Sequence, residues 1–227
     1  MMGSVKKVKH TNSIIEYQDF LTPESCEKLI NYFNTDKSMW METCFYNSSV
    51  MNLLDPLSKY NGHEINEEYF KNLRQELWAL AEDASGTRLN NLTFSAARWL
   101  PGAYADPHSD NSELDGTPNA WQDNKFVTII YLNDNYQGGE LVFNYHNISI
   151  SPSTGTVVAF DPGIINVHSV SKITGGERYT MLASWDYANV EYTEEQLEAI
   201  RLEKEAMKPI QQKQREEWKN KNNAMED

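Results

Sequence analysis

Two segments in the N-terminal part of the chain carry hydrophobic residues at helical spacing. The first begins at Thr22-Pro23-Glu24, where an N-cap residue is followed by proline in the first helical turn, and it ends near residue 34. The second covers about 66–83, stops near Ser85-Gly86, and has an apolar stripe made of Phe70, Leu73, Leu77, Leu80 and Ala81. The pattern predicts two amphipathic helices that pack on a flat surface.

The hydrophobic period changes from helical to strand-like at residue 91. Short runs rich in β-branched and aromatic residues cover 92–100, 126–132, 140–145, 148–150, 155–160 and 179–185. Glycine and proline turn signals separate these runs, and no helical pattern lies between them. Because a parallel sheet needs crossover helices, the spacing predicts a mainly β fold with flanking helices, namely an antiparallel sandwich or barrel such as a jelly roll.

The pattern changes again after residue 192. Residues 193–196 form a capping-box sequence, and Leu197, Ile200 and Met207 give a thin apolar stripe before Pro209, which is expected to interrupt the helix. This tail is either a solvated helix lying on the domain or a segment that binds a partner or dimerises. We therefore expect one domain with three parts: a buttressing segment over 1–89, a β core over 90–190 and a helical tail over 191–227.

Composition narrows the classes of protein. The 227 residues are 40% hydrophobic and 23% charged, which is ordinary for a globular protein, and the net charge of −13 disfavours nucleic acid as a partner. No apolar run reaches 18 residues and the N-terminus lacks the apolar centre of a secretory signal, so we expect no membrane partner and a cytoplasmic location. Two cysteines, Cys26 and Cys44, allow at most one bridge. The oligomeric state stays open.

Candidate chemistry lies in the β region. His108 and Asp110 are two positions apart, so they share a face if the segment is extended, and with a further histidine they could form the two-histidine, one-carboxylate triad of non-haem iron oxygenases. An isolated H-x-D pair is more often a simple turn. His168 lies in a semi-apolar extended run, ten residues before Arg178, and a hairpin turn at 174–176 is expected to place Arg178 near the metal. Its guanidinium could hold a carboxylate.

Five motifs in a fixed order carry a resemblance to a known family. They are RWLPGAYADPHSD, VTIIYLND, GGELVF, GTVVAFD, and HSV followed by ERY. Together they resemble the iron(II)- and 2-oxoglutarate-dependent dioxygenases of the prolyl 4-hydroxylase-like group, over roughly residues 90–190. The resemblance implies a double-stranded β-helix, a jelly-roll variant, buttressed by N-terminal helices. It also implies Fe(II), with 2-oxoglutarate and O₂ as cosubstrates and ascorbate as an additional reductant.

The resemblance also implies residue roles. His108, Asp110 and His168 match the catalytic metal ligands, and Arg178 matches the basic residue that pairs with the distal carboxylate of 2-oxoglutarate. The remaining candidates each have a structural alternative: Tyr131 binds the same carboxylate or packs in the core, Thr128 and Tyr104 line the pocket less clearly, and Arg98 and Lys125 face the substrate or are solvated strand charges.

Two departures from the family pattern concern the pocket wall. Tyr104 is four residues before His108, where relatives often have three, and Ser184 occupies the position of a tryptophan, with Trp185 expected to point to the other face. The resemblance favours hydroxylation of a prolyl residue in a protein or peptide. A free amino acid or small metabolite is the alternative substrate, and a non-catalytic jelly-roll binding protein is the alternative of another class.

Overall fold

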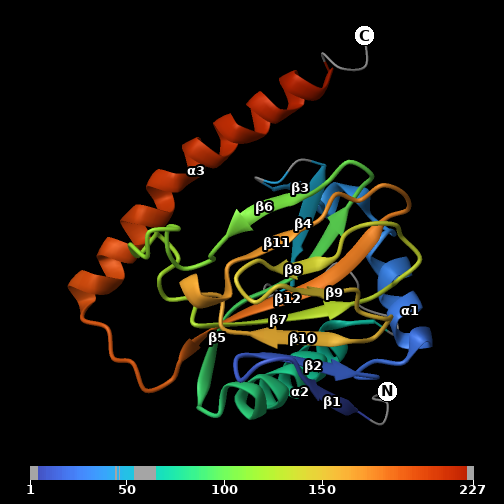
Figure 1. Cartoon of the computed structure of the whole chain (residues 1–227), viewed down its shortest axis with the longest axis horizontal. Helices are drawn as coiled ribbons and strands as arrows, with labels where there is room; N and C mark the ends of the chain where they lie inside the picture. Colours follow the sequence, from blue (N-terminus) through green and yellow to red (C-terminus); the bar gives the residue numbers. More distant parts are fainter. Residues whose placement is uncertain (1–4, 44, 46, 54–64, 224–227) are drawn as a thin grey trace.

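Two antiparallel β-sheets face each other in the computed structural model, which describes residues 5–43, 45, 47–53 and 65–223 (Figure 1). The larger sheet has eight strands in the order β1-β2-β10-β7-β12-β5-β4-β3. Its strands are β1 (Lys6–Lys9), β2 (Ile14–Gln18), β10 (Val157–Phe160), β7 (Phe126–Tyr131), β12 (Arg178–Tyr187), β5 (Leu89–Trp99), β4 (Ser48–Asn52) and β3 (Met41–Glu42).

The smaller sheet has four strands in the order β6-β11-β8-β9. These are β6 (Ala105–His108), β11 (His168–Val170), β8 (Leu141–Phe143) and β9 (Ile148–Ile150). Nine residues, including Tyr131, Phe143 and Phe160, form a buried cluster drawn from strands of both sheets. The expected fold class, a mainly β jelly roll with flanking helices, is confirmed.

Two helices cover the other face of the larger sheet (Figure 1). α1 (Pro23–Phe33) begins where Thr22 Oγ1 accepts a hydrogen bond from the Ser25 backbone, and α2 (Glu67–Ser85) begins where the Asn66 side chain accepts one from the Tyr69 backbone. α2 ends at Gly86, whose φ of +70° is accessible to glycine at little cost. Both helices lie within two residues of the ranges that the sequence predicts.

The apolar stripe of α2 anchors this helix to the sheet. Leu77 is completely buried in the cluster that α1, α2 and the larger sheet share. We expect Leu77→Ala to lower the free energy of unfolding by about 2–5 kcal/mol, because it removes apolar contacts and leaves a cavity. Denaturant titration measures this change. Leu197→Ala, at an exposed site, is the matched control and should stay within about 0.5 kcal/mol.

The N-terminal segment contains strands as well as helices. β1 and β2 extend the larger sheet beside β10, and β3 and β4 extend it beside β5. The sequence analysis predicted only helices here. β1 reads KKVK and β2 contains the buried Glu16, which bonds His10 and Gln18. Because β1 and β2 contain charged residues, a search for hydrophobic patterns does not detect them. Lysines are nevertheless common on edge strands such as β1.

The expected hairpin at 174–176 is wrong. β11 pairs with β6 and β8 in the smaller sheet, whereas β12 pairs with β5 and β7 in the larger one. The segment between them therefore passes from one sheet to the other. Gly138 and Gly176 support this passage with φ of +73° and +74°, and a Cβ at Gly138 would lie 2.0 Å from the Lys172 carbonyl oxygen.

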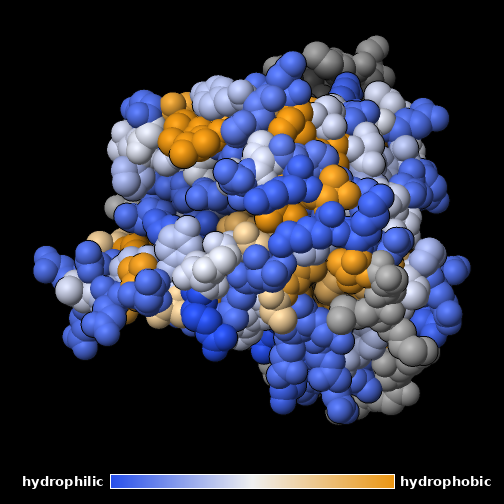
Figure 2. Space-filling model, turned by 60° about the horizontal axis from the view of Figure 1, so that its bottom comes forward, coloured by the Kyte–Doolittle hydropathy of each residue, from blue (hydrophilic) through white to orange (hydrophobic). Residues whose placement is uncertain are grey.

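The C-terminal helix is longer than expected. α3 (Glu194–Asn223) continues through Pro209, so the predicted interruption is wrong. It extends away from the sheets (Figure 1), and Lys204 near its middle donates to both carboxylate oxygens of Asp123 at 2.9 and 2.6 Å. None of the described helices has the length and apolarity that a membrane crossing requires. Figure 2 shows a mainly hydrophilic face on which apolar residues form separate patches.

The cysteine prediction is only partly accessible to the structure. Cys26 is a free, buried thiol whose pKa burial raises to about 12, so it is a packing residue and a poor nucleophile. Cys44 lies outside the described residues.

Candidate metal and cosubstrate site

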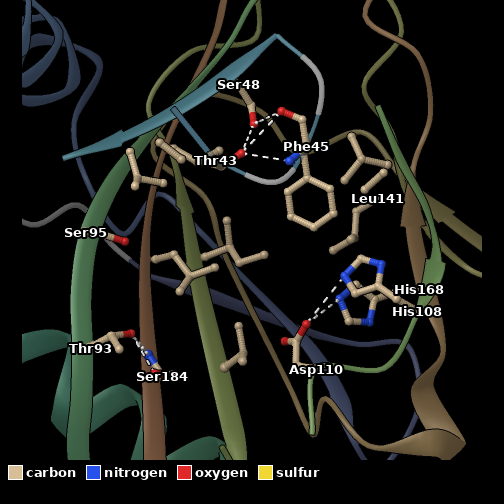
Figure 3. Close-up of a pocket in the computed structure, with 18 of the residues that line it drawn as sticks. Thr43, Phe45, Ser48, Thr93, Ser95, His108, Asp110, Leu141, His168 and Ser184 are labelled. Carbon is tan, nitrogen blue, oxygen red and sulfur yellow. Dashed lines mark hydrogen bonds and ion pairs between the residues drawn. The ribbon is translucent and has the colours of Figure 1, made fainter. Parts of the chain in front are cut away.

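Three side chains converge at one side of the space between the sheets (Figure 3). His108 ends β6, Asp110 follows two residues later, and His168 begins β11. Asp110 Oδ1 lies 3.4 Å from His108 Nε2 and 3.6 Å from His168 Nε2. The possible ligand atoms are all within 4.8 Å of one another, and this is the only such group of three among the described residues.

A β-bulge aims His108 at this site. His168 pairs with His108, and Val170 pairs with Ala105, so two steps on β11 face three steps on β6. The extra residue in β6 lets Ala105 and His108 face the same side, which simple alternation would forbid. An extended run through Asp110 was expected, but β6 ends at His108, and Asp110 is held by its own N–H, which donates to the Pro162 carbonyl.

Backbone carbonyls fix the orientation of both imidazoles. His108 Nδ1 donates to the Asp106 carbonyl at 2.7 Å, and His168 Nδ1 donates to the Asn166 carbonyl at 3.0 Å. Because a carbonyl oxygen only accepts, each neutral ring carries its hydrogen on Nδ1 and presents the lone pair of Nε2. Such a bond to the far nitrogen is typical of metal-binding histidines. Both Nε2 atoms therefore suit a metal.

Asn166 holds the His168 side of the site in place. Its side chain is 1% exposed and accepts hydrogen bonds from Ser13 Oγ at 3.2 Å and from His146 Nε2 at 2.8 Å. Its Nδ2 donates to the Asp161 carbonyl at 2.7 Å. The amide thus ties the carbonyl that orients His168 to three separate segments, and sequence analysis missed it. A polar residue inside the apolar run IINV was the available signal.

We expect Asn166→Ala to weaken metal binding about 10–100-fold, the range typical for loss of an outer hydrogen bond. The Asn166 side chain holds the backbone carbonyl that orients His168. The loss of metal affinity should therefore come from a shift of the His168 ring. Calorimetric titration with Mn(II) measures it. Asn34→Ala removes another hydrogen-bonded asparagine, which caps the end of α1 and does not line the cavity, and should leave metal affinity unchanged. Equal metal affinity in the Asn166 variant would contradict this role.

The electrostatics of the triad couple its three groups. Burial lowers the pKa of His168 below the ordinary value. Burial acts in the same direction on His108, but the hydrogen bond and charge of Asp110 outweigh it and the net pKa is raised. Burial opposes ionisation of Asp110, yet the neighbouring imidazoles hold its pKa below the ordinary value. The carboxylate is therefore ionised at neutral pH and supplies the negative charge that a cation needs.

Arg178 is a buried cation without a carboxylate partner among the described residues. It is 2% exposed, its Nη2 donates to the Tyr131 hydroxyl at 3.2 Å, and its Nε has no partner in the described part of the chain. The guanidinium also lies 5.3 Å from the ring centre of Trp99 and 5.0 Å from that of Tyr131. Since a buried unpaired charge is costly, this arrangement fits a site that receives an anion.

One cavity of about 570 Å³ connects the triad with Arg178. The volume lies in the range of small-molecule sites. Strands of both sheets line it, through His108 and His168 on one side and Val127, Ile129, Thr180 and Leu182 on the other. Two imidazole nitrogens and a carboxylate suit iron(II) and leave coordination positions for other ligands, while Arg178 suits the far carboxylate of a diacid. The residues present therefore fit Fe(II) and 2-oxoglutarate.

Among the other candidates, Tyr131 lies beside Arg178 and Thr128 does not line the cavity. On β7, Val127 and Ile129 face the cavity, so Thr128 faces α2, where its hydroxyl accepts from Trp185 Nε1 at 3.0 Å. Burial raises the pKa of Tyr131 and keeps its hydroxyl neutral. Trp185 is packed on the helix side, as expected, whereas Ser184 lines the cavity.

The remaining candidates, Tyr104, Arg98 and Lys125, do not line the cavity. Ala105 lines the cavity, and its neighbour Tyr104 lies before β6 and is not among the lining residues. Arg98 alternates with the lining residues of β5 and pairs with Glu177 at 3.2 Å. Lys125 precedes β7, where its N–H donates to the Trp185 carbonyl. The alternation of side chains along each strand decides which residues face the cavity, and the sequence does not show which alternate set this is.

Comparison with known proteins agrees with this geometry. Residues 94–185 match the model of the 2OG-Fe(II) oxygenase superfamily. Human prolyl 3-hydroxylase 3 is 35% identical over 112 residues, and rat prolyl 3-hydroxylase 2 is 31% identical over 83 residues. These alignments cover 44% and 31% of this chain, but only 15% and 12% of the respective relatives.

Solved structures share the fold over most of the chain. A viral collagen prolyl hydroxylase from Paramecium Bursaria Chlorella virus-1, in its 2OG complex, gives a TM-score of 0.59 at 19% identity and covers 78% of this chain and 97% of its own. A prolyl hydroxylase from Trichoplax adhaerens, with a peptide fragment of hypoxia inducible factor, gives 0.57 at 17% identity, covering 78% and 84%. Residues 94–185 thus match the 2OG-Fe(II) oxygenase superfamily in sequence, and the chain shares the fold of these two solved structures.

Proposed function

We propose that this protein is an Fe(II)- and 2-oxoglutarate-dependent dioxygenase that hydroxylates a prolyl residue in a protein or peptide. The observation that carries the proposal is the cavity with a His108–Asp110–His168 cluster on one side and the buried, carboxylate-free Arg178 on the other. In the overall reaction, 2-oxoglutarate, O₂ and the substrate C–H group become succinate, CO₂ and the hydroxylated product.

The residues of this chain bind and orient the reactants. His108, Asp110 and His168 would hold Fe(II), which when bound supplies the centre at which O₂ reacts. Arg178 and Tyr131 fix the distal carboxylate of 2-oxoglutarate, because a planar guanidinium and a neutral hydroxyl both donate hydrogen bonds to it. The apolar residues Ile129 and Leu182 exclude water between these two ends. Side chains of His108 and Asp110 are 30% and 25% exposed, so the metal side stays open to substrate.

The relatives support proline as the target. The human and rat relatives are named prolyl 3-hydroxylases, and two structural neighbours are named prolyl hydroxylases. Because those curated relatives are much longer than the matched region, the substrate comes to this chain as a proposal. Which carbon of the proline ring receives the hydroxyl is a question for experiment.

The test combines two measurements. Protein loaded with Fe(II) and 2-oxoglutarate, with ascorbate as an auxiliary reductant, should form succinate, and proline-containing peptides should gain 16 daltons on proline by mass spectrometry. Removal of the metal with a chelator should abolish both signals, and Fe(II) should restore them. Oxygen added only to a free amino acid or another metabolite would replace the substrate proposal. Absence of succinate above background would overturn the dioxygenase proposal itself.

A further inference from the structure

The cavity extends beyond what the cosubstrate needs. β12 contributes Arg178, Thr180, Leu182 and Ser184 to its wall, which are alternate residues on one face. At about 3.3 Å per residue, Ser184 lies roughly 20 Å along the strand from Arg178. This span is much longer than 2-oxoglutarate, so the Ser184 end is available to another molecule.

The triad lies between the two ends of this span. Gly139 marks the Arg178 end, since a Cβ there would lie 3.3 Å from Arg178 Cδ. Phe143 lies four residues further along the β8 segment and pairs with His168, about 13 Å away at strand spacing. The cosubstrate therefore occupies the stretch from Arg178 to the triad, and the Ser184 end lies on the substrate side.

Hydroxyl groups with unused donor capacity line the Ser184 end. Ser184 Oγ and Thr93 Oγ1 are 2.6 Å apart, so one O–H serves their mutual bond and the other is left over (Figure 3). Ser95, two residues along β5 from Thr93, points its hydroxyl into the cavity and has no hydrogen-bond partner among the described residues. Two O–H donors are therefore available to an acceptor.

An unused acceptor lies at the same end. Asn124 lines the cavity, and its Oδ1 is buried without a hydrogen-bond partner in the described part of the chain. Its position follows from the sheet: Val127 pairs with Ser184, and the N–H of Lys125 donates to the Trp185 carbonyl. A buried amide oxygen without a donor is rare in proteins and costs stability, so a ligand N–H that reaches Asn124 would satisfy this acceptor.

We propose that Thr93, Ser95, Ser184 and Asn124 form a subsite that binds a peptide group of the substrate next to the residue that reacts. The hydroxyls donate to its C=O and Asn124 Oδ1 accepts from its N–H. The charged cavity-lining residues other than histidine are Glu42, Asp110 and Arg178; none is on β5, and Arg178 lies at the other end of β12 from Ser184. A neutral ligand group is thus favoured over a carboxylate or an amine. The inference rests on the proposed function, because it places the reacting carbon at the triad.

The subsite predicts recognition of a polypeptide, not of a free amino acid. Only a substrate with an amide next to the reacting residue can place a C=O and an N–H in the subsite while its reacting carbon lies at the triad. A side-chain carboxamide of asparagine or glutamine in the substrate has the same chemistry, so the test must separate it from the backbone amide.

The experiment is a double-mutant cycle between the protein and acetylated, amidated pentapeptides with a central proline. Each flanking backbone N–H is methylated in turn, and Asn124→Ala removes the acceptor assigned to it. We expect one N-methylated peptide to show a KM raised about tenfold, Asn124→Ala to raise the KM of the parent peptide similarly, and the combination to add little more. Ser184→Ala, which leaves Asn124 intact, should raise KM while leaving the N-methylation effect in place.

Controls separate the subsite from the rest of the reaction. Thr35→Val, which removes an exposed hydroxyl just after the end of α1, should change no KM. Uncoupled conversion of 2-oxoglutarate without peptide is measured as the baseline, and its absence in the native protein would count against the proposed function instead. Peptides in which a flanking Asn or Gln replaces Ala distinguish a side-chain carboxamide as the source. Fully multiplicative effects of Asn124→Ala and every N-methylation, or turnover of metabolites but of no peptide, would overturn the subsite.

Discussion

Asp110→Ala is expected to reduce succinate formation to background while the protein stays folded. The carboxylate is the one anionic group of the triad, and its removal leaves two imidazoles that bind a divalent cation weakly. Its side chain contacts His108 and His168 and contributes nothing to the hydrophobic clusters, so the melting temperature should change little. Succinate assays, calorimetry with Mn(II) and thermal melting measure the three quantities.

Asp115→Ala provides the matched control for this experiment. Asp115 is an exposed aspartate in the same loop, and it accepts a hydrogen bond from the Thr117 backbone at 2.9 Å. Its replacement should leave metal affinity and turnover at native levels. Turnover of Asp110→Ala within a few-fold of native would show that the triad is not the metal site.

Arg178→Met is expected to weaken 2-oxoglutarate binding roughly ten- to a hundredfold, because a charge-assisted hydrogen bond contributes about 1.5–3 kcal/mol. Arg178→Lys keeps the charge but loses the planar pair of donors, so its affinity should be intermediate. Without cosubstrate, Arg178→Met should be at least as stable as the native protein, since replacing an unpaired buried cation with an apolar side chain removes a desolvation cost. Thermal melting with and without 2-oxoglutarate shows both effects.

Arg98→Met separates this role from a general effect of removing a sheet arginine. Arg98 lies on the neighbouring strand β5, next to Trp99, which is the residue that pairs with Arg178. It forms an ion pair with Glu177 and does not line the cavity. Its replacement should leave the affinity for 2-oxoglutarate unchanged. If both variants lost affinity equally, or neither did, the assignment of Arg178 would be wrong.

The sequence predicted the elements that have a clear period and the groups that have a distinctive chemistry. α1 and α2 followed from caps and apolar stripes, and the clustering of His108, Asp110 and His168 followed from motif order. Arg178 was correctly expected near the metal site, but for a wrong reason. A hairpin was expected to bring Arg178 there, whereas the chain crosses from the smaller sheet to the larger one.

The side-chain directions on the buried strands could not be predicted. All six residues of β7 are buried, because one face meets the smaller sheet and the other meets α2, so FVTIIY shows no alternation that would mark the cavity face. Thr128 was therefore placed on the wrong face. The bulge in β6 and the exposed lysines of β1 are further features that pairing reveals and a single sequence conceals.

The anchoring groups for the cosubstrate belong to different layers of the sandwich. His168 is on the four-stranded sheet and Arg178 is on the eight-stranded sheet, with Phe143 and Phe160 packed between layers at a ring-centre distance of 5.1 Å. An enzyme of the proposed kind would therefore hold its cosubstrate across the two layers, so a variant that changes how the two sheets pack would alter the fit of 2-oxoglutarate without replacing either anchor.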